Sequence, residues 1–298
     1  DKIALLKSSG SCDFCNLSKG NLEGSDLDGV SLRYANLSNV NLINANLSNA
    51  NLTNANLSSA NLTNANISRS DLFGVNLTNA NLSGVNLTST VLTGANIQVA
   101  IFVNANLSRL NLSGVDLSDK DLSGAILNFA NLSGANLTGV DLTNKDLTGV
   151  NLSGVDLSNQ DLTGTILLHA NLSDANLTEV NLKSLDLTSI NLSRVDLSDK
   201  DLSGAILNFA NLSGANLTGV DLTNKDLTGT NLSGVDLGNK DLTGTILTYA
   251  NLSGANLTGV DLTNKDLTSI NLSGVDLSNQ DLTGTILTYA NLSGANLS

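Results

Sequence analysis

Residues 235–269 read VDLGNKDLTGTILTYANLSGANLTGVDLTNKDLTS, and leucine occupies every fifth position after Leu237. The same spacing runs from Leu17 to Leu297, and 54 of the 57 central positions are leucine, the exceptions being Ile67, Ile97 and Phe102. The residue before the centre is Asn or Asp in 49 of 57 repeats, and the residue after it is Ser or Thr in 45. Ala or Val is most frequent two residues before the centre. The repeat is therefore A-[N/D]-L-[S/T]-[G/N].

A period of five fits neither an amphipathic helix nor an ordinary strand. It fits a chain that turns a corner every five residues, and if four such sides close one coil, the coil is 20 residues long. The central residue and the residue two before it would point inward, and the other three would point outward. Each short side would hydrogen-bond to the sides above and below it, as in a parallel sheet, which satisfies the backbone polar groups.

This pattern resembles the pentapeptide-repeat family over about residues 10–298. The resemblance implies an all-β fold, a right-handed quadrilateral parallel β-solenoid. With 57 repeats and four repeats per coil, we expect roughly 14 coils. Residues 1–11 are expected to form an N-terminal cap or docking segment, and residues 12–298 a single solenoid.

Charge divides the predicted solenoid into two parts. Residues 1–114 carry six acids and six bases, whereas residues 115–298 carry 21 acids and eight bases, which accounts for the net charge of −13. From Val115 onward the pentads also follow a longer period of 40 residues, or two coils. An acidic part of this size argues against nucleic-acid binding and favours cationic partners, metal ions or solubility.

In the acidic part the residue before each leucine differs among the four sides. On the first side Asp alternates with Asn, on the third Ile alternates with Asp, and the fourth is all Asn. The second side forms a nearly continuous acidic column of Asp121, Asp141, Asp161, Asp201, Asp221, Asp241, Asp261 and Asp281. Repulsion between stacked carboxylates is expected to raise the pKa of some of them. Ca²⁺ could bind this column, but the Asp-x-Asp loops of calcium sites are absent.

An apolar contact stripe is predicted on the third side. Each Ile there is followed three residues later by an aromatic residue or a histidine, and the stripe comprises Ile126, Phe129, Ile166, His169, Ile206, Phe209, Ile246, Tyr249, Ile286 and Tyr289. If these side chains point outward, they form a surface of the kind that contacts other molecules. The alternative is that the coil bulges at these positions and tucks each Ile inside.

Lysines occupy inward positions of the acidic part, where Ala, Val or Thr would be expected. Lys200 and Lys240 alternate with Val along one column, and Lys225 and Lys265 alternate with Ala or Thr along the next. Because a buried ammonium needs a partner, we expect the stems to pack inward and the heads to reach carboxylates such as Asp241.

Cys12 and Cys15 form the single Cys-x-x-Cys of the chain, and both fall at inward positions. We expect small buried apolar groups there, with a disulfide as the alternative. Zinc is disfavoured because no second pair of ligands lies nearby.

A leucine-filled solenoid leaves no pocket for convergent catalytic groups, so we expect no enzyme activity and no cofactor. The favoured function is a structural or protein-interaction rod that assembles end to end or laterally, since the stripe offers a contact and the chain stops in mid-repeat at ANLSGANLS. One alternative is an acidic module that mimics DNA, because some members of the family bind DNA gyrase. Another is an ice-binding or surface-binding protein with rows of Thr.

The partner is expected to be a protein or a second copy of this chain. The sequence has no run of 18 apolar residues, so we expect no transmembrane segment. Asp1 is not an initiator Met, which favours a processed form exported to the periplasm, the cell surface or the medium, with the cytoplasm as the alternative.

Overall fold

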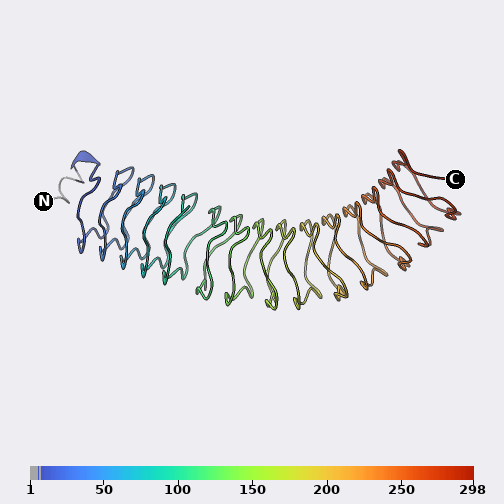
Figure 1. Cartoon of the computed structure of the whole chain (residues 1–298), viewed down its shortest axis with the longest axis horizontal. Coiled ribbons are helices and arrows are strands. Elements are labelled where there is room, and N and C mark those ends of the chain that lie inside the picture. The colour runs from blue at the N-terminus through green and yellow to red at the C-terminus, as the bar shows by residue number, and fades with distance from the viewer. Residues whose placement is uncertain (1–5, 7) are drawn as a thin grey trace. The chain divides into compact units, whose positions relative to one another are not determined.

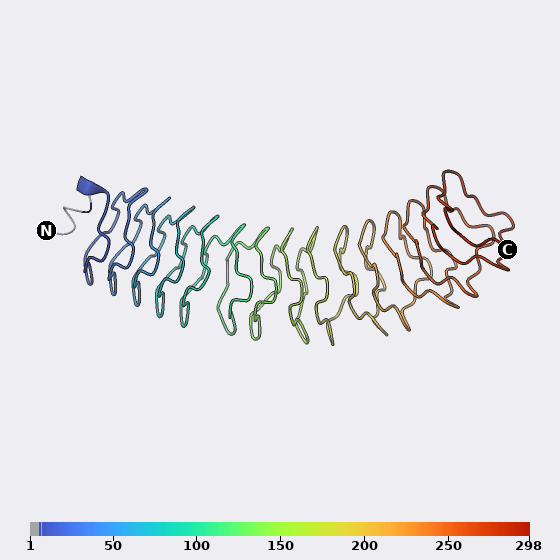
Figure 2. The ribbon, with the colours of Figure 1, turned by 45° about the horizontal axis from the view of Figure 1, so that its top comes forward.

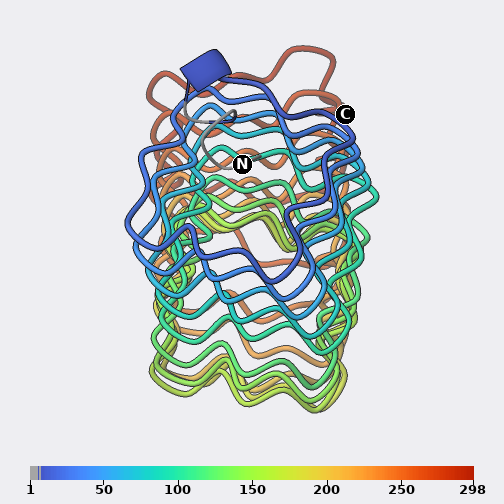
Figure 3. The ribbon, with the colours of Figure 1, turned by 90° about the vertical axis from the view of Figure 1, so that its left-hand side faces the viewer.

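A computed structural model describes Leu6 and residues 8–298 of the chain. Leu6, Ser8 and Ser9 are helical, and the turn ends where the Gly10 N–H donates to the Leu6 carbonyl at 3.0 Å. Asp1–Leu5 and Lys7, which belong to the predicted cap, lie outside the described residues. The chain then continues as successive coils (Figure 1). In Figure 3 the coils nearest the viewer, coloured blue, each trace a four-sided loop.

The coils pair through single parallel β-bridges between residues that are 20 apart, which confirms the predicted coil length. Asn36 bridges Asn56, for example. The Leu37 N–H donates to the Asn56 carbonyl at 2.7 Å, and the Asn56 N–H donates to the Ala35 carbonyl at 2.9 Å. Each side is too short to form a longer strand, because the chain turns after every bridge.

The corners explain the other recurring features of the pentad. The Ala35 N–H donates to the Leu32 carbonyl at 3.1 Å and closes a four-residue turn. The residue two after each central position from Cys12 to Leu292 has a positive φ, and of these 57 residues 23 are Gly and 34 are not. Asn side chains cap the sides locally: the Ser38 N–H donates to Oδ1 of Asn36 at 3.1 Å. The outer positions of the repeat therefore serve turn formation.

The core is a stack of leucines, as predicted. Central residues are almost all buried, and even Phe102 is only 1 % exposed. Most Ala and Val side chains two residues before the centres are buried as well. The exceptions include the inward lysines of the acidic part, which are half-buried.

Two compact units make up the chain, residues 1–141 (unit 1) and 142–298 (unit 2). We describe each by itself. The single solenoid over residues 12–298 with a charge boundary at 114 stays a prediction.

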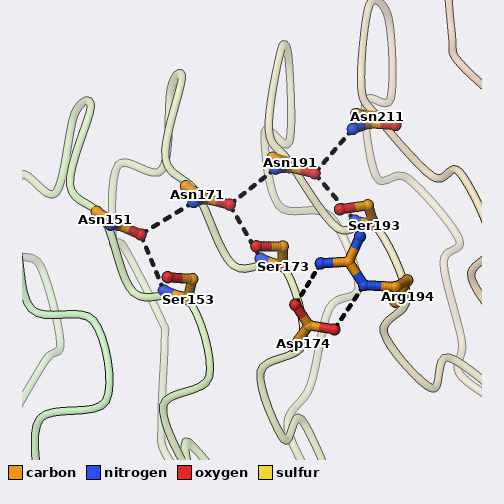
Figure 4. Close-up of polar contacts among 9 residues, drawn as sticks. All are labelled: Asn151, Ser153, Asn171, Ser173, Asp174, Asn191, Ser193, Arg194 and Asn211. Carbon is orange, nitrogen blue, oxygen red and sulfur yellow. Dashed lines mark hydrogen bonds and ion pairs between the residues drawn. The ribbon is translucent and has the colours of Figure 1, made fainter.

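In unit 2 the fourth side carries a continuous ladder. Bridges link every neighbouring pair of its Asn residues from Asn151 to Asn291. Their amides also form a chain, since Nδ2 of Asn171 donates to Oδ1 of Asn151 at 2.9 Å and Nδ2 of Asn191 donates to Oδ1 of Asn171 at 2.8 Å (Figure 4). Beside this ladder Arg194 forms an ion pair with Asp174 (Figure 4). We call the fourth side of unit 2 the Asn spine.

The other three sides of unit 2 are paired incompletely. Among the described residues of this unit the second side forms no bridge. The first and third sides pair at alternate junctions: Asp196 bridges Asn216 on the first side, and Asp226 bridges Ile246 on the third. The predicted bonding of every side to its neighbours is therefore wrong for this unit.

The inward lysines account for the unpaired sides. At the corner between the first and second sides, Nζ of Lys240 donates to the Val220 carbonyl at 3.0 Å. In a paired junction that carbonyl would accept the backbone N–H of Asp241. At the next corner Nζ of Lys265 donates to the Leu242 carbonyl at 2.6 Å. Each long side chain thus holds two coils apart at its corner.

Charge is not what separates the coils. Gln280, in the column of Lys240, donates to the Leu257 carbonyl at 2.8 Å. Leu185, in the column of Lys265, is half-buried and has no polar group in its side chain. The expected packing role of these residues therefore fits the structure, but the expected pairing of the lysine heads with carboxylates such as Asp241 is wrong. The Lys240 head binds the Val220 carbonyl, which lacks its ladder donor where the coils separate. The Lys265 head binds the Leu242 carbonyl, which also accepts the Thr245 N–H of its own turn at 2.9 Å.

Candidate functional site

The contact stripe lies on the outside of the coils. Its isoleucines are about half exposed, from 46 % for Ile246 to 51 % for Ile166, so the coil does not tuck them inside. The ring residues are exposed as well, with 60 % for Phe209 and 63 % for Tyr249, and His169 is also exposed. Main-chain pairing is kept on one edge of these positions in unit 2, where Ile246 bridges Asp226 of the preceding coil.

Backbone strain marks the ring residues of the stripe. Phe129, His169, Phe209, Tyr249 and Tyr289 all have φ between 58° and 62°, at the corner position where glycine or Asn is usual. A bulky residue in this left-handed region costs roughly 1–3 kcal/mol. Since these side chains are also exposed, burial cannot compensate for that cost. The sequence carried a signal of this strain, because most of the glycines occupy the same position of the pentad, but the prediction of the stripe did not use it.

The rings alternate with small residues along their column. Gly229 and Ser269 occupy the corner positions 20 residues after Phe209 and Tyr249. The ring edge of Phe209 lies over Gly229, since Cδ1 would be 2.4 Å from a Cβ at that glycine. In unit 1, the Arg109 guanidinium lies 4.9 Å from the Phe129 ring centroid. The rings therefore lie against small neighbours or stack with a cation rather than entering the core.

Each stripe isoleucine also removes a local hydrogen bond. At Asn251 the side-chain Oδ1 accepts the Ser253 N–H at 3.1 Å, and most Asn and Asp positions make the same turn bond. Ile246 has no acceptor to offer the Thr248 N–H. The stripe thus replaces residues that favour the turn with residues that do not.

The acidic column lies on the second side, which forms no β-bridge among the described residues of unit 2. Its carboxylates accept hydrogen bonds from the residue two positions on: Oδ1 of Asp241 accepts the Thr243 N–H at 2.8 Å. The side-chain hydrogen bond from Thr243 is the main reason that the pKa of Asp241 lies below its usual value. The pKa is also lowered at Asp201 and Asp281, mainly by the side-chain hydrogen bonds of Ser203 and Thr283, and at Asp221 and Asp261, mainly by the backbone N–H groups of Thr223 and Thr263.

The expected rise in these pKa values is therefore wrong. Asp241 does repel Asp221, and Asp281 repels Asp261, but this effect is smaller than that of the hydrogen bonds from the threonines. Turn geometry places two donors on each carboxylate, whereas the neighbouring carboxylate is one coil away and separated by solvent. The column accordingly keeps its negative charge.

The lowered pKa values predict how stability changes with pH. Because these carboxylates have a lower pKa in the folded state, their contribution is present above the unfolded value of about 3.9 and is lost as pH falls through the folded values. The urea midpoint of unfolding should stay level from neutral pH down to about 5 and fall below about 4. Asp241→Asn keeps the Oδ1 acceptor but does not titrate, so its decline should be shallower. A column dominated by repulsion would instead become more stable in acid.

Cys12 and Cys15 are joined by a disulfide in the structure rather than remaining free thiols, with their Cα atoms 5.4 Å apart. The turn brings the two inward positions within bonding reach, a distance that the sequence left open. Phe14 lies between them and stacks on Tyr34 of the next coil, with ring centroids 4.9 Å apart. Corner rings on consecutive coils can thus stack face to face.

No metal or membrane site emerges from the residues that the structure describes. Over Leu6 and residues 8–298, no group of three or more His, Cys, Asp or Glu residues could hold a metal ion. Within the same residues, no helix is both long and apolar enough to span a bilayer.

The pentad pattern can now be compared with known proteins. The sequence profile of the pentapeptide repeats matches segments that run from residue 11 to residue 298. The chain belongs to the pentapeptide-repeat family. A comparison with curated protein sequences finds no match.

Several solved pentapeptide-repeat structures are similar to this chain. HetL from Nostoc, described as involved in heterocyst differentiation regulation, is 27 % identical over 98 % of this chain and 94 % of its own, with a TM-score of 0.28. A protein of the Arabidopsis thaliana thylakoid lumen is 38 % identical over 31 % of this chain and 66 % of its own, with a TM-score of 0.30. QnrB1, a plasmid-mediated fluoroquinolone resistance protein, is 15 % identical over 92 % of this chain and 89 % of its own, with a TM-score of 0.25.

Proposed function

We propose that this pentapeptide-repeat protein is a non-enzymatic interaction scaffold, and that copies of the chain associate laterally through the contact stripe. The observation that carries the proposal is the backbone strain at Phe209, Tyr249 and the other ring residues of the stripe. These exposed rings occupy left-handed positions at a cost to the folded chain. Side chains that weaken folding and still recur every 40 residues are explained by a gain on binding.

The spacing of the stripe favours a second copy as the partner. Its rows recur on every second coil, roughly 10 Å apart. A second copy carries rows at that spacing, with glycine or serine between them to receive the opposing rings. Phe14 and Tyr34, at the corresponding corner of a different side, stack with ring centroids 4.9 Å apart, so rings at a pentad corner can pack face to face on consecutive coils. Lateral association would bury apolar area that is otherwise exposed.

The proposal is tested by sedimentation of the full chain over a range of concentrations. The double variant Ile246→Asn with Tyr249→Gly restores the turn acceptor and relieves the left-handed residue. We expect association at least about tenfold weaker, together with a free energy of unfolding that is higher by about 1–2 kcal/mol.

Ser269→Gly is the matched control. It relieves the same backbone strain one coil further along the same column (φ 58°) but leaves every ring of the stripe in place. It should therefore raise stability without weakening association. Sedimentation of the unmodified protein as a monomer at all concentrations would refute self-association. We do not extend the proposal to a gyrase-type target or to ice, because no contact of the described residues favours either.

A further inference from the structure

A second surface lies in unit 1, where the ladder is interrupted. The junction between residues 71–80 and 91–100 is fully paired. The Leu72 and Leu77 N–H groups donate to the Val91 and Asn96 carbonyls at 2.8 and 2.7 Å. Four further backbone bonds, made by the N–H groups of Gly74, Asn79, Val91 and Asn96, complete this junction.

The next junction, between residues 91–100 and 111–120, has none of these bonds. Among the described residues, Val91 does not bridge Asn111, and Asn96 does not bridge Asp116. No backbone hydrogen bond joins residues 90–99 to residues 111–118. The opening is a crevice of about 630 Å³, with residues 92–99 on one wall and residues between 111 and 120 on the other. In Figure 2 the teal and green coils on either side of it are further apart than the blue coils.

Two bulky inward residues hold this junction open. Leu110 is fully buried at a position where the preceding coil has Thr90, and Lys120 is half-buried where the preceding coil has Ala100. They lie at the two corners that bound the crevice. The arrangement is the one seen at Lys240 in unit 2, except that here two long residues act on one junction.

Each wall of the crevice is an unpaired strand edge. The N–H groups of Leu92, Gly94, Ile97 and Val99 are the donors that would pair with Asn111, Ser113, Asp116 and Ser118 in a closed ladder. A ligand that satisfies both walls must offer donors and acceptors on both of its edges at strand spacing. An extended polypeptide does this, as in β-strand addition.

The surroundings of the crevice define the chemistry of that polypeptide. Val91, Val99 and Ile101 are exposed by 46 %, 67 % and 45 %, at positions where the repeat usually has Asn, Asp or Gly. Residues 111–121 carry three carboxylates, from Asp116, Asp119 and Asp121, against a single lysine. Apolar contacts and a positive charge on the incoming segment would therefore both be favourable.

We propose that the crevice between residues 92–99 and 111–120 binds an extended, basic segment of a partner protein, which inserts as a strand and completes the interrupted ladder. This surface is separate from the contact stripe, so the inference does not depend on the proposed self-association.

The test uses the full chain and a fluorescent synthetic peptide, AKLTKAKLTK, which places leucine at the pentad spacing and lysine on its outer face. Binding is followed by fluorescence anisotropy, and hydrogen exchange is followed by mass spectrometry. In the free protein the Leu92, Gly94, Ile97 and Val99 amides should exchange at least about tenfold faster than the Leu72, Gly74, Leu77 and Asn79 amides, which are bonded, and the peptide should slow them. The same peptide with alternate amides N-methylated should not bind, because it lacks the donors for one wall.

Two variants distinguish peptide binding in the crevice from nonspecific attraction between opposite charges. Leu110→Ala with Lys120→Ala should let the junction close, so that residues 92–99 become protected without peptide and binding weakens at least about tenfold. Asp116→Asn keeps its turn acceptor and should weaken binding only about two- to threefold, since it removes one charge. Protected Leu92, Gly94, Ile97 and Val99 amides in the free protein, no saturable binding, or equal binding of the N-methylated peptide would each overturn the inference. Variants of Ile246 and Tyr249 should leave peptide binding unchanged.

Discussion

Asn191→Ala is expected to lower the free energy of unfolding by about 2–4 kcal/mol, because it interrupts the Asn spine. Nδ2 of Asn191 donates to Oδ1 of Asn171 at 2.8 Å, and its own Oδ1 accepts Nδ2 of Asn211 at 3.0 Å and the Ser193 N–H at 3.0 Å (Figure 4). Truncation removes all three bonds, so that Nδ2 of half-buried Asn211 and the Ser193 N–H lose their acceptor, and Oδ1 of Asn171 keeps only the Ser173 N–H. The effect is large because the fourth side alone pairs at every junction among the described residues of unit 2.

Asn181→Ala provides the matched control on the second side. Asn181 is exposed, and its Oδ1 accepts the Lys183 N–H at 3.0 Å, a bond within its own turn. We expect a loss of about 0.5–1 kcal/mol. Urea unfolding gives the comparison, and hydrogen exchange at Leu192 and Leu212 adds a local measure, because repeat arrays open locally before they unfold. Equal losses for the two variants would mean that the spine has no special role.

The sequence predicted the coil and its core because both follow from one period. Leucine at every fifth residue predicts a corner in every pentad with the central side chains inward, and the resemblance to the pentapeptide-repeat family implies the four sides that make the coil 20 residues long. The same reasoning predicted every side to be paired. The prediction that every side is paired failed at Lys240 and Leu110. A long inward residue can either fill space within its coil or separate two coils, and the sequence does not show how much space the coil interior offers.

The stripe could be predicted only in part. The alternation of Ile with Asp placed the apolar residues on one side, and their exposure then depended on whether the coil deformed. The bridge between Asp226 and Ile246 shows that it does not. The strain at Tyr249 needed the backbone angle, because a positive φ is a property of the corner and not of tyrosine. The direction in which the pKa of Asp241 is shifted likewise depended on hydrogen-bond distances, which the spacing of residues in the sequence does not provide.

Lys240→Val is expected to raise the free energy of unfolding by about 1–3 kcal/mol, although it removes a hydrogen bond. Val is the residue that occupies this column in the neighbouring coils, at Val220 and Val260, where it is buried. With the long side chain gone, the Asp241 N–H can reach the Val220 carbonyl that Nζ of Lys240 now occupies at 3.0 Å. The Leu222 N–H can likewise reach the Asp241 carbonyl. Closure of the first and second sides at this junction would add about four ladder bonds in exchange for one.

Lys183→Val distinguishes separation of the coils from loss of charge. Lys183 is 57 % exposed and lies 3.5 Å from Asp201 on the surface, so its replacement removes the same charge without affecting a corner. Its stability should change by less than about 0.5 kcal/mol. Hydrogen exchange at Leu222 and Asp241 should slow in the Lys240 variant and stay unchanged in the Lys183 variant. A destabilised Lys240→Val protein with rapid exchange at both amides would mean that the lysine anchors the coils, and that the open second side is the most stable arrangement this sequence can adopt.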